Sequence, residues 1–281
     1  MDRRQAQAEI FSHIPKLITQ EHNQILMRPV EMLELEAVVK QMARDTAPGP
    51  DGFTTNFFQE GWAWLKDDLL TIVENSRKTG GILKAFNATF LALIPKENGT
   101  EDLGKFRPIA LCNVIYKIIT KVIANRLKPI LPLLISPEQA GFVEGRQILD
   151  GIILVHETIH SLKQSKTPSM LLKLDLSKAC DKLNWNFLEG ILRSFRFEES
   201  WIRWIINLVS SAFFSILING SPSHPFSASR GIRQGDPLSP FLFIIIAEGL
   251  GRLLRDMQST GKIRGLYLCE STPAQHTSTV R

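Results

Sequence analysis

The sequence predicts an α+β fold in which helices and strands follow one another in mixed order. Apolar residues recur at helical spacing in long stretches near both ends of the chain, for example in residues 32–44 (MLELEAVVKQMAR). Between them lie short apolar runs bounded by turn residues, such as residues 90–94. Asn219 and Gly220 form the strongest short signal for a β-hairpin. Because neither pattern dominates, both element types must share one fold.

The composition fits a globular protein without a membrane span. The chain has 281 residues, of which 44% are hydrophobic and 22% charged, enough for one large domain or two modest ones. Its longest strongly apolar run, residues 241–247, is far shorter than the roughly 20 residues that cross a bilayer. The N-terminus lacks a signal-peptide core, and three widely spaced cysteines fit a reducing compartment. We expect an intracellular protein of the nucleus or cytoplasm.

Positive charge is concentrated in one part of the sequence. The formal net charge is +5, and the segment from Lys84 to Lys128 holds eight basic residues against three acidic ones. A basic segment of this kind attracts a phosphate backbone. A solvated basic face without a ligand is the alternative interpretation.

The first half of the chain alternates helical patterns with one strand pair. Residues 1–45 have helical spacing throughout, and the prolines and glycines of residues 47–52 (APGPDG) then predict a rigid loop. An amphipathic helix is predicted over residues 56–76. Strands follow at residues 90–94 and 107–111, joined through a turn at Asn98 and Gly99. Two further helices are predicted, over residues 114–127 and 147–163.

The second half places a carboxylate at the end of a predicted strand. Residues 170–174 are apolar and β-compatible, and Asp175 follows them directly. Around Asn219 and Gly220, residues 215–218 and 227–230 form the predicted hairpin. A helix over residues 237–257 and a strand over residues 262–268 complete the pattern, and the last ten residues are polar and aperiodic.

Two motif matches point to unrelated chemistry. His156, Glu157 and His160 satisfy the H-E-x-x-H pattern of zinc peptidases, but no convincing third ligand follows. Gly99 to Lys105 nearly fits a phosphate-binding P-loop, yet Phe106 replaces the hydroxyl residue that should reach magnesium. We interpret the first as a helix flank and the second as a turn between strands, and retain a zinc peptidase only as a remote alternative.

Five ordered blocks carry a far more specific signal. They are residues 47–52 (APGPDG), 93–96 (LIPK), 105–109 (KFRPI), 174–179 (LDLSKA) and 230–240 (RGIRQGDPLSP). Their order and spacing resemble the reverse transcriptases of non-LTR (LINE-type) retrotransposons, particularly those of plants. The resemblance covers residues 26–266, nearly the whole chain. It implies a right-hand polymerase fold with fingers and an incomplete palm, without a thumb.

The resemblance implies a role for individual residues. Asp175 matches the first catalytic, metal-binding aspartate, and the backbone carbonyl of Leu176 would face the same Mg²⁺ ion. Lys96 and Arg107 would hold the triphosphate of the incoming nucleotide, since arginine can contact two phosphate oxygens at once. Gln234, Gly235 and Cys180 would also lie at the nucleotide. The family usually has Tyr or Phe where Cys180 stands, so discrimination against ribonucleotides is in doubt here.

The resemblance also predicts how the chain is divided into domains, which partners it binds, and which family motif it lacks. It divides the chain into an N-terminal helical extension (residues 1–45), a fingers-like region (46–165), a partial palm (166–268) and a disordered or frameshifted tail (269–281). The expected partners are an RNA template, a DNA primer and deoxynucleoside triphosphates. The aromatic-Ala-Asp-Asp motif that completes the family's metal site does not occur in this sequence. We therefore expect an inactive reverse transcriptase domain, or alternatively a non-catalytic RNA-binding module derived from one.

Overall fold

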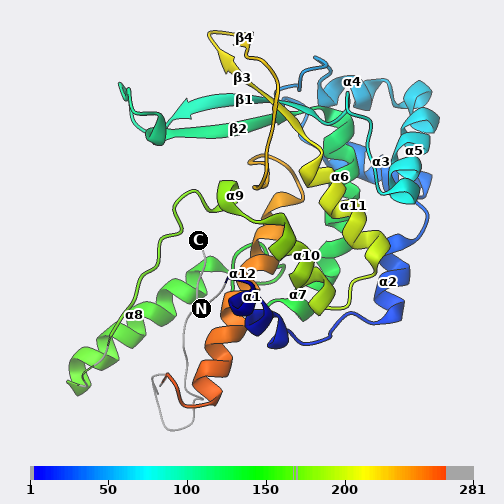
Figure 1. Ribbon diagram of the computed structural model, residues 1–281. Coiled ribbons are helices and arrows are strands. Elements are labelled where there is room, and N and C mark those ends of the chain that lie inside the picture. Colours follow the sequence, from blue (N-terminus) through cyan, green and yellow to red (C-terminus); the bar gives the residue numbers. More distant parts are fainter. Residues whose placement is uncertain (1–2, 167, 169, 264–281) are drawn as a thin grey trace.

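The structure is a computed structural model that describes residues 3–166, 168 and 170–263 of the chain. It confirms the α+β prediction. A twisted sheet lies over a body of packed helices, and one long helix projects from that body (Figure 1). None of the described helices has the length and apolar character that crossing a membrane requires.

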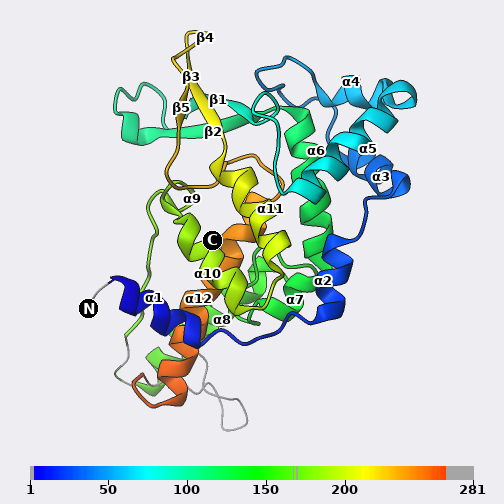
Figure 2. The ribbon, with the colours of Figure 1, turned by 45° about the vertical axis from the view of Figure 1, so that its right-hand side comes forward.

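The N-terminal region consists of three helices rather than one. They are α1 (Arg3–Ser12), α2 (Gln20–Met27) and α3 (Met32–Gln41). The continuous helix predicted over residues 1–45 is therefore wrong, because Pro15 and Pro29 lie in the two breaks and proline disfavours helical backbone in the residue before it. Helix α1 lies across α10 (Trp185–Ser194) and α12 (Ser239–Ser259) (Figure 2).

The amphipathic helix predicted over residues 56–76 is also divided. It forms α4 (Thr55–Glu60) and α5 (Trp62–Thr79), which meet at Gly61. The Thr54 hydroxyl accepts a hydrogen bond from the backbone N–H of Phe57 and so caps the start of α4. Leu69 and Val73 of α5 are buried in the core, but Trp64, which the helical pattern places on the same apolar side as Leu69, is 72% exposed.

The sheet joins strands that are far apart in the sequence. Its members are β1 (Ala88–Pro95), β2 (Phe106–Cys112), β3 (Phe213–Ile218), β4 (Ser221–Pro222) and β5 (Phe226–Ser227). The predicted strand pair is confirmed: β1 and β2 are antiparallel, with Leu91 opposite Ala110. The turn between them holds the short 3₁₀ helix η1 (Leu103–Lys105). Strand β1 also pairs in parallel with β3, which the sequence did not predict.

The hairpin at Asn219 and Gly220 is confirmed, but its returning strand is displaced. Both residues have positive φ, 50° and 80°, as a type I′ turn requires. Strand β3 pairs first with β4 and then with β5. The predicted return over residues 227–230 is therefore wrong except at Ser227, since the chain begins pairing immediately after the turn.

Seven further helices pack below the sheet or project from it. They are α6 (Val114–Leu127), α7 (Leu131–Leu134), α8 (Ile148–Ser165), α9 (Ala179–Lys182), α10, α11 (Glu199–Ser210) and α12. The predicted helices at α6, α8 and α12 are confirmed. The sequence interpretation missed α10 and α11, whose amphipathic spacing and Asn184 cap carry a usable signal.

Helix α12 starts two residues later than predicted. The carboxyl group of Asp236 accepts hydrogen bonds from the Ser239 backbone N–H at 3.1 Å and from its hydroxyl at 3.0 Å. The Asp236 carboxyl group therefore binds the first residue of α12, whereas the residue at the N-cap position is Leu238. The proline of the first turn is Pro240 rather than Pro237.

The strand predicted over residues 170–174 is absent from the structure. Residues 170–176 have no regular secondary structure, and every residue from 170 to 178 is exposed. An apolar run becomes a strand only when a neighbouring strand satisfies its backbone groups, and no described strand pairs with it. The strand predicted over residues 262–268 lies outside the described residues except for its first two.

Two members of the basic segment are buried and support the fold. Arg126 is only 4% exposed and donates to both carboxylate oxygens of Glu34 at 2.8 Å. Its guanidinium also donates to the carbonyls of Leu26, Arg28 and Pro29. Lys117 is likewise buried and donates to the carbonyl of Ala47 at 3.4 Å. Charge along the sequence therefore overstated the positive charge available to a phosphate backbone.

Candidate functional site

The loop before α12 docks against strand β2. The backbone N–H of Ala110 donates a hydrogen bond of 2.9 Å to the carbonyl of Gln234. Gly235 follows with a φ of +104°, and a Cβ atom at this position would lie 3.3 Å from the Ala110 carbonyl oxygen. Both the backbone conformation and the close approach favour glycine. Residues 230–236 are thus held at the edge of the sheet that also carries Arg107.

Helix α9 docks against the same loop from the other side. The backbone N–H of Ile232 donates to the Cys180 carbonyl at 2.9 Å, and that of Gly231 donates to the Leu183 carbonyl at 2.7 Å. The indole N–H of Trp185 donates to the Gly231 carbonyl at 2.7 Å. The Cys180 thiol is half-buried, and burial raises its pKa. The structure therefore holds the predicted block of residues 230–240 against Ala110 and Cys180, the residues that directly follow the predicted blocks 105–109 and 174–179.

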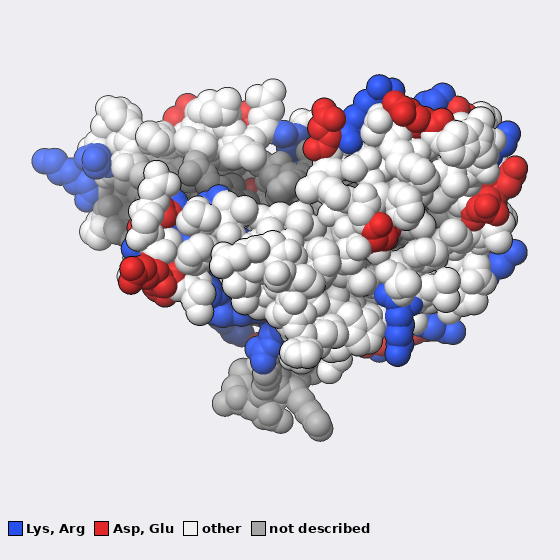
Figure 3. All heavy atoms as spheres, turned by 90° about the horizontal axis from the view of Figure 1, so that it is seen from above, with Lys and Arg blue, Asp and Glu red and all other residues white. Residues whose placement is uncertain are grey.

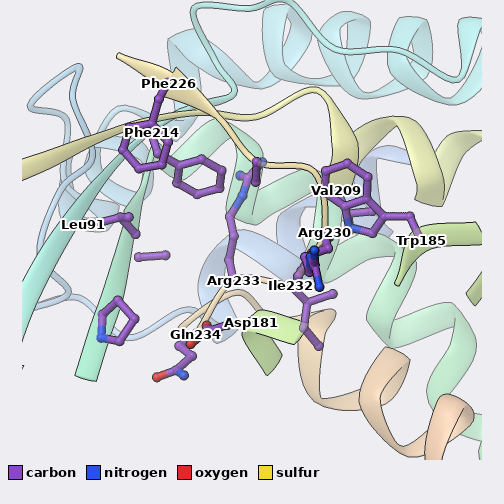
Figure 4. A pocket seen from close by; sticks show the side chains of 14 residues that line it. Leu91, Asp181, Trp185, Val209, Phe214, Phe226, Arg230, Ile232, Arg233 and Gln234 are labelled. Carbon is purple, nitrogen blue, oxygen red and sulfur yellow. Dashed lines mark hydrogen bonds between the residues drawn. The ribbon is translucent and has the colours of Figure 1, made fainter. Parts of the chain in front are cut away.

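A cavity of about 220 Å³ lies between strands β1, β2 and β3 and residues 228–234, and Gln234 is the predicted site residue that lines it. Its walls are mainly apolar: Figure 4 shows Leu91 and Phe214 on one side and Val209 and Trp185 on the other. Gln234 and Asp181 lie at one end of the cavity (Figure 4). Pockets that are largely apolar with a few convergent polar groups are typical of ligand sites.

Lys96 and Arg107 lie on the β1–β2 hairpin and are exposed. The backbone N–H of Lys96 donates to the Lys105 carbonyl at 2.9 Å, which closes the hairpin beyond the strands. Neither side chain forms an ion pair within the described residues, whereas Lys105 pairs with Glu97 at 2.8 Å. Because side chains alternate along a strand, Arg107 lies on the face of β2 opposite to Pro108 and Ala110, which line the cavity.

Asp175 and Leu176 lie in the exposed segment that leads into α9. Asp175 accepts a backbone hydrogen bond from Ser177 at 3.2 Å through its carbonyl, so this contact does not orient its carboxylate. Within the described residues, no three His, Cys, Asp or Glu side chains are grouped so that they could hold a metal ion. This applies equally to His156 and His160, which are exposed on α8. One carboxylate and one carbonyl do not make a complete magnesium site.

The sequence interpretation missed Arg233, the residue directly before Gln234. Its side chain is 6% exposed and reaches into the interior between β2, α6 and α11. The same segment holds a second buried ionisable group, Asp236, three residues after Arg233. Burial raises the pKa of its carboxyl group. The signal was present in residues 230–240, but a sequence alone does not distinguish a buried arginine from one at the surface.

Basic side chains do not form one continuous patch on the face above the sheet. Seen from that side, the middle of the face is largely uncharged, and lysines and arginines stand mainly toward its margins (Figure 3). On this face, a phosphate backbone would therefore meet separate basic points rather than a broad positive surface.

Sequence comparison identifies the class of protein, a nucleic-acid polymerase domain, and its family. Residues 94–268 match the family described as reverse transcriptase (RNA-dependent DNA polymerase). The chain belongs to this family and is a reverse transcriptase domain.

Its relatives include proteins of transposable elements. The chain is 30% identical over 262 residues to the transposon TX1 uncharacterized 149 kDa protein of Xenopus laevis, covering 93% of this chain and 20% of that protein. It is 27% identical over 248 residues to the retrovirus-related Pol polyprotein from type-1 retrotransposable element R2 of Popillia japonica, covering 88% and 33%. The chain thus spans between a fifth and a third of the length of these relatives.

Among solved structures, the chain is similar to one described as a partial Cas6-RT-Cas1–Cas2 complex. The sequence identity is 16% and the TM-score 0.44, and the match covers 86% of this chain and 35% of that one.

Proposed function

We propose that this domain forms the nucleotide side of an RNA-directed DNA polymerase site in a LINE-type retroelement of plant origin. One observation carries the proposal. Two backbone hydrogen bonds of 2.9 Å, from Ile232 to Cys180 and from Ala110 to Gln234, join three segments that are distant in the sequence. All three segments hold residues that the family resemblance assigns to nucleotide binding.

In the proposed complex, Arg107 and Lys96 contact the triphosphate, with Arg107 on the face of β2 that points away from the cavity. Both are exposed and free of ion pairs within the described residues, so a phosphate group would not have to displace an internal partner. Gln234 can donate and accept hydrogen bonds at the sugar and template, and the exposed Gly235 leaves room for a close approach. Cys180 would lie beside the sugar, where its small thiol would discriminate poorly between the two sugar types.

Asp175 and the Leu176 carbonyl are the proposed ligands of Mg²⁺. They supply hard oxygen atoms of the kind that this ion prefers, but the described residues offer no group of three ligands. We therefore derive no metal-dependent step from this chain. We propose instead that the chain alone does not extend a primer, since a single carboxylate does not organise two magnesium ions.

The proposed partners are an RNA template, a DNA primer and deoxynucleoside triphosphates. The proposed division into a helical extension, fingers and partial palm follows the resemblance. The pairing of β1 with β3 means that the proposed fingers and palm would share one sheet across their boundary.

Nucleotide binding by the full chain tests the proposal. A titration with a fluorescent deoxynucleoside triphosphate and Mg²⁺ should show saturable binding, and Arg107→Ala should weaken it about tenfold, because charge-assisted hydrogen bonds contribute roughly 1.5–3 kcal/mol each. Arg203→Ala is the matched control, since Arg203 is an exposed arginine of α11. Equal binding by the two variants would refute the assignment of Arg107.

Primer extension tests the expected inactivity. A DNA primer annealed to an RNA template is incubated with the full chain, Mg²⁺ and the four deoxynucleotides, and no extended product should appear. If an extended product appeared, the proposed inactivity would be wrong, but the proposed nucleotide site would not be affected. Binding of RNA with a linear fall of log K against log[salt], but without any nucleotide binding, would instead identify the non-catalytic RNA-binding module.

A further inference from the structure

The side chain of Arg233 forms hydrogen bonds with three residues that are distant from it in the sequence. Its guanidinium donates to the side-chain carbonyl of Asn87 and to the backbone carbonyl of Leu208, the latter at 3.2 Å. The other terminal nitrogen lies 3.8 Å from the Cys112 sulfur. One side chain thus connects the loop before α12 with the segment entering β1, with the end of β2 and with α11.

Aromatic rings enclose the same guanidinium. It lies over the Tyr116 ring at 3.9 Å from the ring centre, and the Phe214 ring is 5.7 Å away. Asn87 is itself held in place, because its amide nitrogen donates to the Leu208 carbonyl at 3.2 Å and to the Ser211 hydroxyl at 2.8 Å. The position of the guanidinium is therefore determined from several directions at once.

Stability alone does not explain a buried arginine here. No carboxylate among the described residues forms a direct ion pair with Arg233, although the buried Asp236 attracts it at longer range. The equally buried Arg126 pairs directly with Glu34. Removing a charge from water costs several kcal/mol, and apolar residues of similar volume often replace buried charges without loss of stability. What an apolar residue cannot supply is a planar fork that fixes one backbone position relative to three separate elements.

The fixed backbone position is the one that precedes Gln234. From Arg233 the chain passes to the Gln234 carbonyl, which the Ala110 N–H holds, and then to Gly235 with its positive φ. We propose that Arg233 is a positioning residue that sets Gln234 and Gly235 at the nucleotide. This inference rests on the proposed nucleotide site.

The test compares two ligands that share a triphosphate. The full chain is titrated with Mg²⁺ and either a deoxynucleoside triphosphate or inorganic tripolyphosphate. The wild type should bind the nucleotide more tightly, and Arg233→Gln should reduce this preference about tenfold, as expected when one or two hydrogen bonds are lost. Its affinity for tripolyphosphate should be unchanged, because Arg107 remains.

Two controls separate positioning from general destabilisation. Arg126→Gln removes an equally buried arginine at the other end of α6 from Tyr116, and it should lower the melting temperature without changing the preference. Tyr116→Phe keeps the ring under the guanidinium and removes a hydroxyl that has no hydrogen-bond partner within the described residues, so it should behave as the wild type. If Arg233→Gln does not fold, Asn87→Ala removes one acceptor of Arg233, together with the two hydrogen bonds that the Asn87 amide donates, and should lower the preference in the same direction.

Hydrogen exchange provides a readout that does not need a nucleotide. In Arg233→Gln, the Ala110 amide should exchange about tenfold faster than in the wild type, because its bond to Gln234 is weakened. Arg126→Gln should not have this local effect. An unchanged preference together with unchanged exchange at Ala110 would overturn the positioning role. If the wild type bound the deoxynucleoside triphosphate no more tightly than tripolyphosphate, the proposed nucleotide site would be refuted. The hydrogen-exchange rate of the Ala110 amide in Arg233→Gln would then still test whether Arg233 positions Gln234.

Discussion

Residues 230–240 and residues 170–178 both carry blocks that the family resemblance selects, yet the structure treats them in opposite ways. In the first segment, Arg233, Asp236 and Leu238 are buried, and backbone hydrogen bonds reach β2 and α9. In the second, every residue is exposed, although five of the nine are large and apolar. A motif can therefore be equally clear in the sequence and very differently supported in space.

The difference shows what a segment requires in order to become ordered. The loop of residues 230–240 folds back on elements that exist without it, and each contact offsets part of the entropy lost on ordering. The segment of residues 170–178 has the pattern of a strand but no neighbouring strand within the described residues. The half of the candidate site that holds Gln234 is thus prearranged, and the half that holds Asp175 is not.

Limited proteolysis should give the largest contrast between the two segments. Trypsin should cleave after Lys173 or Lys178 at least about a thousandfold faster than after Arg233, because cleavage at a buried site requires unfolding of several kcal/mol. The cleavage products are identified by mass spectrometry at early times. Early cleavage after Arg233 would show that the loop is not held as described.

Leucine truncation should give the next largest contrast. Leu238 is fully buried and Leu174 is 65% exposed. Leu238→Ala should lower the free energy of unfolding by about 2–5 kcal/mol through lost burial and a new cavity, and Leu174→Ala should change it by less than about 0.5 kcal/mol. Urea denaturation measures both. A large effect at Leu174 would mean that the exposed segment packs against the rest of the protein in solution.

The pH dependence of stability should give the smallest contrast. Burial raises the pKa of Asp236 above its ordinary value of 3.8, so between the two values the native state holds a proton that the unfolded state has released. The free energy of unfolding should then fall as the pH rises through this interval, by at most about 1.4 kcal/mol per pH unit. Asp236→Asn should remove this contribution, as measured by denaturation at several pH values. Asp67→Asn, at an exposed position in α5, should retain it.

Local signals in the sequence were sufficient for many elements. The β1–β2 pair and the turn at Asn219 and Gly220 were both predicted from residues close to one another in the chain. The same approach failed for residues 170–174, since a strand is a property of two segments. It also failed for Arg126 and Arg233, because charge in a sequence does not distinguish a surface side chain from a buried anchor.

The sequence by itself determined the element types, the family and the blocks in which the candidate site residues lie. These follow from periodicity, turn chemistry and motif order, all of which are written along the chain. Only the tertiary structure decided that β1 pairs with β3, that Cys180 and Gln234 meet at one loop, and that Asp175 stands in an exposed segment. The physical reason is that hydrogen-bond partners and burial are supplied by residues from about fifty to more than a hundred positions away, and no local pattern records which partners are present.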